Sequence, residues 1–201
     1  MDEAGSRPMS SAFGDVSTDD VVKFAAEFPL AWITPVADPA ASLLMPLLIE
    51  TDPAGQPVSV VGHLPRRAPA TELLQQDGRA VFLFLGPNAY IPPAWVSKPG
   101  WVPTWNFLSL KILSDQAEIE DSLTRPAVEA LVRHMESRQG SDWSVDDIGE
   151  RYDTLLNQII GFRSNITSAQ PRFKLGQDET PAVHEEIKQA LEPHPMAQWM
   201  K

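Results

Sequence analysis

The chain has 201 residues, of which 43% are hydrophobic and 21% charged, and this length and composition are typical of one globular domain. It contains no cysteine, which excludes disulfides, thiolate metal sites and cysteine nucleophiles and favours a cytoplasmic location. The formal net charge is −11, from 16 basic and 27 acidic residues, and this argues against direct nucleic-acid binding, which usually needs a basic face.

The N-terminal segment is acidic and polar, and it lacks the basic region and apolar core of a signal peptide. The apolar runs elsewhere are too short to span a bilayer, so no membrane segment is predicted. We expect residues 1–16 to be disordered, residues 17–192 to form a single domain, and residues 193–201 to be a tail.

A helix is predicted over residues 17–28, because Ser17 or Thr18 can cap it and Pro29 ends it. A second, short helix is predicted over residues 69–76. The turn DPAGQ indicates a hairpin between two of the strands in this half, and Pro46 indicates a bulge or an edge position. The apolar runs that predict strands lie at 31–36, 42–50, 57–64 and 80–86.

The stretch GPNAYIPPAWVSKPGWVPTWNF (86–107) contains five prolines and three tryptophans, which is unusual for a plain connecting loop. Its prolines favour an extended crossover that fixes the aromatic rings in place. The strand predicted over 104–120 alternates, so Thr104 and Asn106 share a face with apolar residues while Trp105 falls on the other face. Two hydrogen-bonding side chains at the rim of an apolar interior are typical of a ligand pocket.

The second half of the chain adds three helices and one strand. Thr124 and Ser144 are the predicted N-caps of two of the helices. The helices are predicted over 124–139, 144–161 and 180–192, and the strand over 162–175. About six strands interspersed with helices, without strict β-α-β alternation, predict an α+β fold: a mainly antiparallel barrel with flanking helices.

His63 ends a predicted strand, and Arg66 and Arg67 follow within one turn. An imidazole and two guanidinium groups could surround an anionic cofactor, because arginine suits phosphate and carboxylate. The imidazole could also stack, donate a hydrogen bond or ligate haem iron, and a core histidine bonded to backbone is an equal alternative. Lys174, at the end of a late strand, could add a further positive charge.

Five motifs occur in the order seen in one family: GHLPRRAP (62–69), GPNAYIPPAW (86–95), VPTWNF (102–107), IIGF (159–162) and KLGQ (174–177). From about residue 13 to residue 191 the sequence resembles the PaiB-like proteins, catalogued as FMN-binding negative transcriptional regulators. The resemblance implies an FMN-binding split β-barrel that is generally a homodimer, with flavin sites near the subunit interface.

The resemblance also implies a set of cofactor-binding residues, to which we add Arg67 as a donor outside the family pattern. It favours Arg66 and Lys174 as phosphate partners, and Thr104 and Asn106 as contacts to the planar ring. The positions that match the family pattern are His63, Arg66, Tyr90, Trp95, Thr104, Trp105, Asn106, Lys174 and Gln177.

The chain departs from the family pattern near its end, where Asp178 and Glu179 replace an asparagine and an arginine. Each lost charge-assisted hydrogen bond would weaken phosphate binding by about 1.5–3 kcal/mol. Several functions therefore stay open: a flavin-dependent oxidoreductase, a PaiB-like regulator acting indirectly, or a pocket without a redox cofactor. A haem-dependent enzyme on the same fold, similar to the piperazate synthases or HugZ-type haem oxygenases, would use His63 as its axial ligand.

Overall fold

The computed structural model of the protein describes residues 13–201, which divide into two compact units. Of the described residues, unit 1 comprises 13–17, Leu85–Ser109 and Gln170–Lys201, and unit 2 comprises Thr18–Phe84 and Leu110–Ala169. Of the segment predicted to be disordered, residues 1–12 lie outside the described part of the chain. Phe13, by contrast, is buried, and its carbonyl accepts a hydrogen bond of 2.9 Å from the Phe173 amide.

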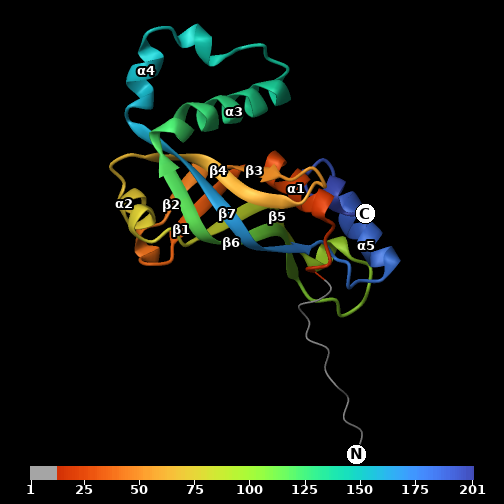
Figure 1. The fold of residues 1–201 in the computed structure, drawn as a ribbon. Coiled ribbons are helices and arrows are strands. Elements are labelled where there is room, and N and C mark those ends of the chain that lie inside the picture. The colour runs from red at the N-terminus through yellow and green to blue at the C-terminus, as the bar shows by residue number, and fades with distance from the viewer. Residues whose placement is uncertain (1–12) are drawn as a thin grey trace, which may run out of the picture. The chain divides into compact units, whose positions relative to one another are not determined.

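Seven strands form one antiparallel sheet in the order β2-β1-β5-β6-β7-β4-β3 (Figure 1). This confirms the predicted α+β class and the split-barrel architecture. The strands are β1 (Leu30–Pro35), β2 (Leu43–Pro46), β3 (Leu48–Thr51), β4 (Pro57–Pro65), β5 (Ala80–Ile91), β6 (Thr104–Glu120) and β7 (Ile159–Lys174).

The seventh strand arises because the single strand predicted over 42–50 is divided at Leu47. Its two halves, β2 and β3, lie at opposite edges of the sheet. Pro46 has no amide hydrogen to continue the ladder, and the Leu47 amide instead donates to the Pro29 carbonyl at 2.8 Å. The Leu47 side chain lies over Gly62 of β4, where an added Cβ would come within 2.7 Å of the leucine, so only glycine allows this close approach.

The α-helices are α1 (Thr18–Glu27), α2 (Pro69–Gln76), α3 (Asp121–Gln139), α4 (Arg151–Leu156) and α5 (Pro181–Ala190). Within unit 2, α3 packs against β4, and Figure 1 shows it crossing the strands as a long green helix. Thr124, predicted to cap α3, lies inside the helix, and its hydroxyl accepts a hydrogen bond of 2.9 Å from the Gly161 amide. Among the described residues, no helix is both long and apolar enough to cross a membrane.

The helix predicted over 144–161 is wrong in its extent. Ser144 does cap a helix, but only a 3-10 turn over Val145–Ile148, which ends where Gly149 adopts φ +67°. The short α4 follows, and β7 already begins at Ile159. Gly161, predicted to end the helix, lies in β7, where an added Cβ would come within 2.2 Å of the Leu123 backbone carbon. Val145, Tyr152 and Ile160 of this segment are buried while Leu155 is exposed, so its apolar spacing does not reflect one continuous helix.

The core of unit 2 is made mainly of apolar side chains that alternate with more exposed ones along the strands, together with side chains from α1 and α2. Phe82 and Phe162 stack in parallel with ring centroids 6.0 Å apart. Each fully buried side chain of this size contributes about 1.5–3 kcal/mol relative to an exposed one. The largest buried members are Phe24, Ile33, Leu47, Leu64, Leu74, Phe82, Phe84, Leu110, Ile112 and Phe162.

Unit 1 has its own core, to which the segment predicted as a tail contributes. Residues Ala197–Trp199 form a 3-10 turn, and Trp199 packs edge-on against Phe173 at 5.7 Å between centroids. Helix α5 buries Val183 and Ile187 in the same unit. The C-terminal residues of the chain are therefore part of the packed structure that carries the end of β7.

Candidate functional site

Unit 1 contains a cavity of about 310 Å³ between the start of β6, the end of β7 and the segment that precedes β6. This volume lies at the lower end of the range of about 300–1,000 Å³ that small-molecule sites occupy. The residues that line it are Lys98, Gly100, Trp101, Val102, Pro103, Thr104, Asn106, Lys174, Gly176, Asp178, Glu179 and Ile187.

Asn106 is the buried polar residue of this cavity, with only 1% of its surface exposed. Neither the nitrogen nor the oxygen of its side-chain amide has a hydrogen-bond partner among the described residues. A buried polar group without a partner costs about 1–3 kcal/mol, so native structures rarely keep one without a reason. The amide presents one donor and one acceptor side by side, which is the pattern needed to bind a cyclic amide or imide.

Two features place this amide in the cavity. Along β6 the side chains alternate, so Asn106 shares the buried face with Leu108 and Leu110, as predicted. Gly176 provides room beside the amide, because a Cβ built on it would lie 3.8 Å from the Asn106 nitrogen and 3.4 Å from the His184 ring. Gly176 adopts φ +81°, a conformation that L side chains rarely adopt.

Thr104 and Lys174 meet in the same cavity, where the Lys174 ammonium donates a hydrogen bond to the Thr104 hydroxyl. The same ammonium lies 6.0 Å from the centre of the Phe13 ring. Both residues were predicted as cofactor contacts, and the structure brings them together with Asn106. Lys174 is half-buried, and it is one of the two lysines that line the cavity.

The segment before β6 is fastened to the chain around α5 by two carboxylates. The Trp101 indole donates to the Glu179 carboxylate at 2.8 Å. Glu186 accepts hydrogen bonds from the backbone amide and the hydroxyl of Ser97, and these bonds hold the pKa of the Glu186 carboxyl below its usual value. These contacts hold the tryptophan wall of the cavity in place.

The other predicted aromatic residues lie outside the cavity lining. Tyr90 and Trp105 are both exposed and form a tilted pair with ring centroids 5.9 Å apart. The Trp105 indole donates to the Asn88 amide oxygen at 3.3 Å. Since Trp105 alternates with Asn106 on β6, it lies on the opposite face of that strand. Trp95 is exposed in the 3-10 turn Pro93–Trp95.

Gln177 has a structural role within unit 1. Its side-chain oxygen accepts a hydrogen bond from the Leu175 amide at 2.6 Å, and its nitrogen donates to the Phe173 carbonyl. Both groups of the side chain are therefore used to shape the turn after β7. This turn presents Gly176 and Glu179 to the cavity.

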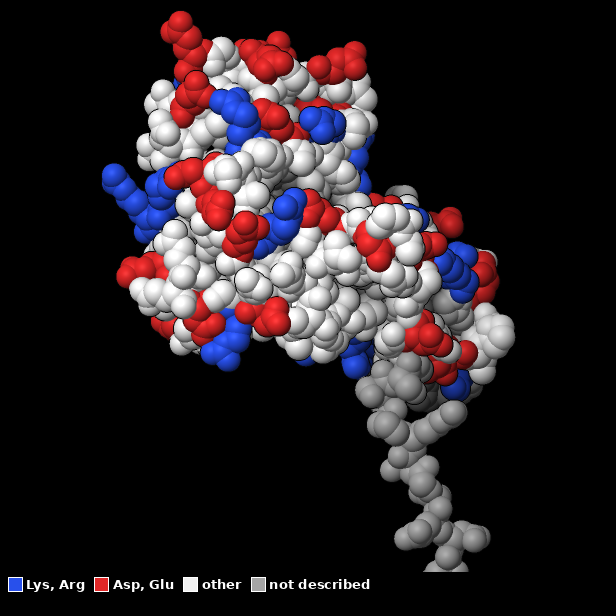
Figure 2. All heavy atoms as spheres, viewed as in Figure 1, with Lys and Arg blue, Asp and Glu red and all other residues white. Residues whose placement is uncertain are grey.

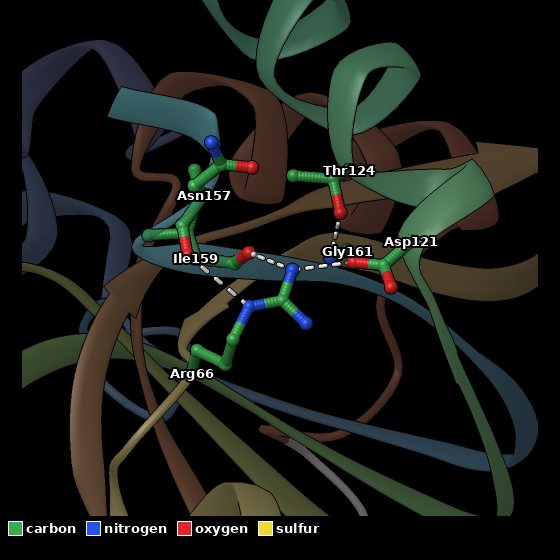
Figure 3. A network of polar contacts seen from close by, with 6 residues as sticks. All are labelled: Arg66, Asp121, Thr124, Asn157, Ile159 and Gly161. Carbon is green, nitrogen blue, oxygen red and sulfur yellow. Dashed lines mark hydrogen bonds and ion pairs between the residues drawn. The ribbon is translucent and has the colours of Figure 1, made fainter. Parts of the chain in front are cut away.

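The three other predicted site residues belong to unit 2. Arg66 donates from Nε to the Asn157 carbonyl at 3.3 Å and from Nη2 to the Ile159 carbonyl at 2.8 Å, and it forms an ion pair with Asp121 (Figure 3). This network joins the end of β4 to α3 and to the start of β7. The Arg66 guanidinium also lines a cavity of about 400 Å³ in unit 2, together with Arg125.

His63 lies on β4 opposite Gly161 of β7. Its Nδ1 atom is buried and has no hydrogen-bond partner among the described residues. Burial lowers the pKa of the His63 imidazole, because removal from water disfavours the charged form. Arg67 is exposed.

The surface of unit 2 shows how the acidic charge is distributed. On the face drawn in Figure 2, acidic and basic side chains alternate along α3 and the segment that leads to α4, and acidic side chains predominate along the outer margin. In Arg125, for example, the guanidinium pairs with both Glu129 and Asp153. Repulsion of a polyanion by such a margin agrees with the prediction against direct nucleic-acid binding, which stays a prediction.

Nine of the twelve residues that line the cavity were not among the predicted site residues, including Trp101, Gly176 and Glu179. The sequence signal for Glu179 was present, since this position and Asp178 depart from the family pattern. Interpreting those departures as losses of donors missed that both residues line the cavity.

Residues 9–168 match a protein family described as "Putative FMN-binding domain". This match covers well over half of the chain. The chain belongs to this family. Of the residues that line the unit 1 cavity, the family match includes Thr104 and Asn106, whereas Lys174, Gly176 and Glu179 lie beyond it.

A relative in Bacillus subtilis (strain 168), the "Protease synthase and sporulation protein PAI 2", is 22% identical over 134 residues. The alignment spans 66% of this chain and 64% of that protein, so the chain matches less than two thirds of the relative's length.

Two solved structures share the fold. A conserved hypothetical protein from Mycobacterium tuberculosis superposes with a TM-score of 0.57 at 15% identity, covering 85% of this chain and 92% of that one. The FAD- and haem-binding protein from Mycobacterium smegmatis superposes with a TM-score of 0.55 at 14% identity, covering 79% of this chain and 71% of that one.

Proposed function

We propose that the unit 1 cavity binds a flavin, FMN in the first instance, and that the protein serves as a flavin-dependent oxidoreductase. The observation that carries the proposal is the Asn106 amide, which is buried in the cavity with its donor and acceptor both lacking partners among the described residues. Membership of a family described as FMN-binding supports the choice of flavin over other planar ligands.

The residues present fit a flavin ring. Asn106 would hold the edge of the ring that carries an N–H beside a carbonyl group, because a primary amide pairs with both. Trp101 would offer a flat aromatic wall, and Gly176 leaves room beside the amide. A bound flavin would supply one- and two-electron chemistry, while the protein supplies position and electrostatic environment.

The test is the visible absorption spectrum of the purified protein, before and after FMN is added to cofactor-free protein. The expected result is a bound-flavin spectrum that is lost or strongly weakened in Asn106→Leu. Asn88→Leu is the matched control, because Asn88 is an asparagine of the same unit that does not line the cavity. Equal flavin binding by both variants would contradict the assignment of the cavity.

Haem is the second candidate cofactor, and one observation favours it. The buried Nδ1 of His63 has no partner among the described residues, and the lowered pKa of the imidazole keeps the ring in the neutral form that ligates iron. The fold neighbour from Mycobacterium smegmatis is described as binding both FAD and haem. A Soret band on addition of haemin, abolished by His63→Ala, would support this alternative, and a colourless protein that binds neither group would refute both.

We also propose that the protein is a homodimer, as the family resemblance implies. In unit 2 three exposed apolar side chains form a row across neighbouring strands, since Trp32 of β1 is paired with Leu44 of β2 and with Leu83 of β5. Such a row suits an isologous interface, which places the same apolar patch on both subunits. Light scattering should give a dimer mass for the wild type and a monomer mass for Trp32→Lys.

A regulatory role would act through a partner protein or through turnover of a ligand. The net charge of −11 opposes direct contact with DNA. Absence of a gel shift with promoter DNA at low salt is the expected result, and a specific shift would contradict this part of the proposal.

A further inference from the structure

The charges and hydrogen-bonding groups of the unit 1 cavity suit the uncharged ring of a flavin better than its phosphate. We infer that this protein recognises flavins by the ring and binds riboflavin about as tightly as FMN. The inference rests on the proposed function and adds to it the class of ligand that the site selects, namely flavins with or without a phosphate.

The charge balance of the cavity is the first argument. Two lysines, Lys98 and Lys174, line it together with two carboxylates, Asp178 and Glu179, so the formal charges cancel. Sites for phosphate groups usually combine several cationic or backbone donors without competing anions. A phosphate carrying a charge of about −1.5 to −2 would meet both carboxylates here, which would offset its attraction to the lysines.

The availability of the cations is the second argument. The Lys174 ammonium already donates to the Thr104 hydroxyl and lies near the Phe13 ring, and Lys98 is exposed to solvent. An exposed lysine offers a weak, salt-screened attraction, and the Lys174 ammonium has two of its three N–H donors left after the bond to Thr104. Neither lysine therefore forms a complete phosphate site by itself.

Two arginines that line the unit 2 cavity are also engaged. In unit 2 the Arg66 guanidinium holds two carbonyl oxygens and the Asp121 carboxylate. Arg125, which lines the same unit 2 cavity, is paired with Asp153. A phosphate at either guanidinium would lie beside a carboxylate, whose charge would offset part of its attraction.

The buried Asn106 amide provides the specific ligand recognition that the charged residues of the cavity do not provide. Both polar atoms of Asn106 are sealed from water, so a ligand that satisfies them forms hydrogen bonds at little cost in protein desolvation. A ring with an N–H beside a carbonyl can satisfy both, and this edge is the same in riboflavin and in FMN. A ligand that lacks either group leaves the amide unpaired, which is the arrangement that gives a site its strongest discrimination.

Access to the amide requires movement of the cavity wall, because Asn106 is almost completely covered. The Trp101–Glu179 hydrogen bond joins the segment before β6 to the turn after β7 on opposite sides of the cavity. Trp101 is therefore the residue whose fluorescence we expect to report ligand entry. In Trp101→Phe the ligand-dependent fluorescence change should be reduced.

The experiment is a pair of equilibrium titrations of the cofactor-free, full-length protein with riboflavin and with FMN at 0.15 M salt, read by quenching of flavin fluorescence. The two dissociation constants should agree within about fivefold, the limit set by weak, exposed ion pairs. Asn106→Leu should weaken both ligands by about tenfold or more, because it removes the shared hydrogen bonds.

Glu179→Gln separates ring recognition from charge, since glutamine keeps an acceptor for Trp101 but removes the negative charge. It should tighten FMN by about threefold relative to riboflavin, because only FMN carries the charge that Glu179 repels. A wild-type preference for FMN of more than about tenfold would overturn the inference and leave the proposed function intact. If neither flavin binds, the proposed function fails, and the inference fails with it.

Discussion

The Asn106 amide, which lacks partners among the described residues, predicts that this residue lowers the stability of the cofactor-free protein. The side chain is 1% exposed, and neither polar atom is hydrogen-bonded within that part of the chain. Each such group costs about 1–3 kcal/mol, and leucine has the same number of side-chain heavy atoms, so it fills the space without an amide to satisfy. We expect Asn106→Leu to raise the free energy of unfolding by about 1–3 kcal/mol.

For a chain of 201 residues, each kcal/mol corresponds to a rise in Tm of about 2–4 °C. Thermal and urea unfolding of the cofactor-free protein would measure the change. The matched control is Thr71→Val, because Thr71 is 2% exposed but its hydroxyl donates to the Pro65 carbonyl at 2.8 Å. The control should lose about 0.5–1.5 kcal/mol.

The two substitutions should therefore shift stability in opposite directions. If Asn106→Leu destabilises the protein as Thr71→Val does, the amide has partners in the free protein, and the argument for a poised ligand contact is refuted. A stabilised variant that no longer binds flavin would show that the same side chain serves binding at the expense of folding, as at many functional sites.

Three further predictions concern unit 2. Burial lowers the pKa of His63 in the folded state, so its contribution to stability is present above the unfolded pKa of about 6.5 and is lost as the pH falls toward the folded pKa. His63→Gln should flatten the stability profile of chemical unfolding between pH 7 and pH 5, and an unchanged profile would contradict the assignment. Arg66→Met should lower the free energy of unfolding by about 1–3 kcal/mol through lost bonds to two carbonyl oxygens, with little from the pair with Asp121, which is 78% exposed. An unaltered Tm in Arg66→Met would indicate that the side chain is available to bind a ligand. Gly161→Ala should cost about 3 kcal/mol, because its Cβ would meet the backbone of α3, and a cost below about 1 kcal/mol would show that the helix can shift freely.

The sequence predicted the secondary structure best where local chemistry and tertiary packing favour the same element. Thr180 caps α5, with its side chain accepting from the Val183 amide at 3.5 Å. The turn after β3 is held by Asp52, whose carboxylate accepts from the Ala54 and Gln56 amides. In both places a side chain satisfies backbone groups only a few residues away, so the pattern is visible in the sequence.

The failures occurred where distant residues decide the outcome. Pro46 indicated a bulge or an edge position, but it could not show that the chain leaves one edge of the sheet there and joins the other, where the Leu47 side chain lies over Gly62 of β4. Gly161 resembles a helix end until α3 is known to cross it. A glycine required for close approach and a glycine that ends a helix look alike in a single sequence.

The difference between local patterns and contacts with distant residues also explains how far the sequence could predict the site. Periodicity alone placed Asn106 on the buried face of β6, because alternation is a local property of a strand. It could not show that Arg66 would be held by carbonyl oxygens from residues more than ninety positions later in the chain. Arginines chosen for their affinity for phosphate have the same affinity for carboxylates and carbonyl groups of their own protein.

The residues that line the unit 1 cavity come from two parts of the chain, and only one of these parts matches the family. The amide of Asn106 lies inside the segment that matches the family, residues 9–168, whereas Lys174, Asp178 and Glu179 follow that segment. The family description therefore applies to the part of the cavity that contains Asn106, the residue that we propose contacts the flavin ring. Three of the four charges that we propose set the response to phosphate come from this chain's C-terminal segment, and the fourth, Lys98, lies within the family match. Two proteins of this family could therefore share a ring-binding wall and still differ in whether a phosphorylated ligand gains any affinity.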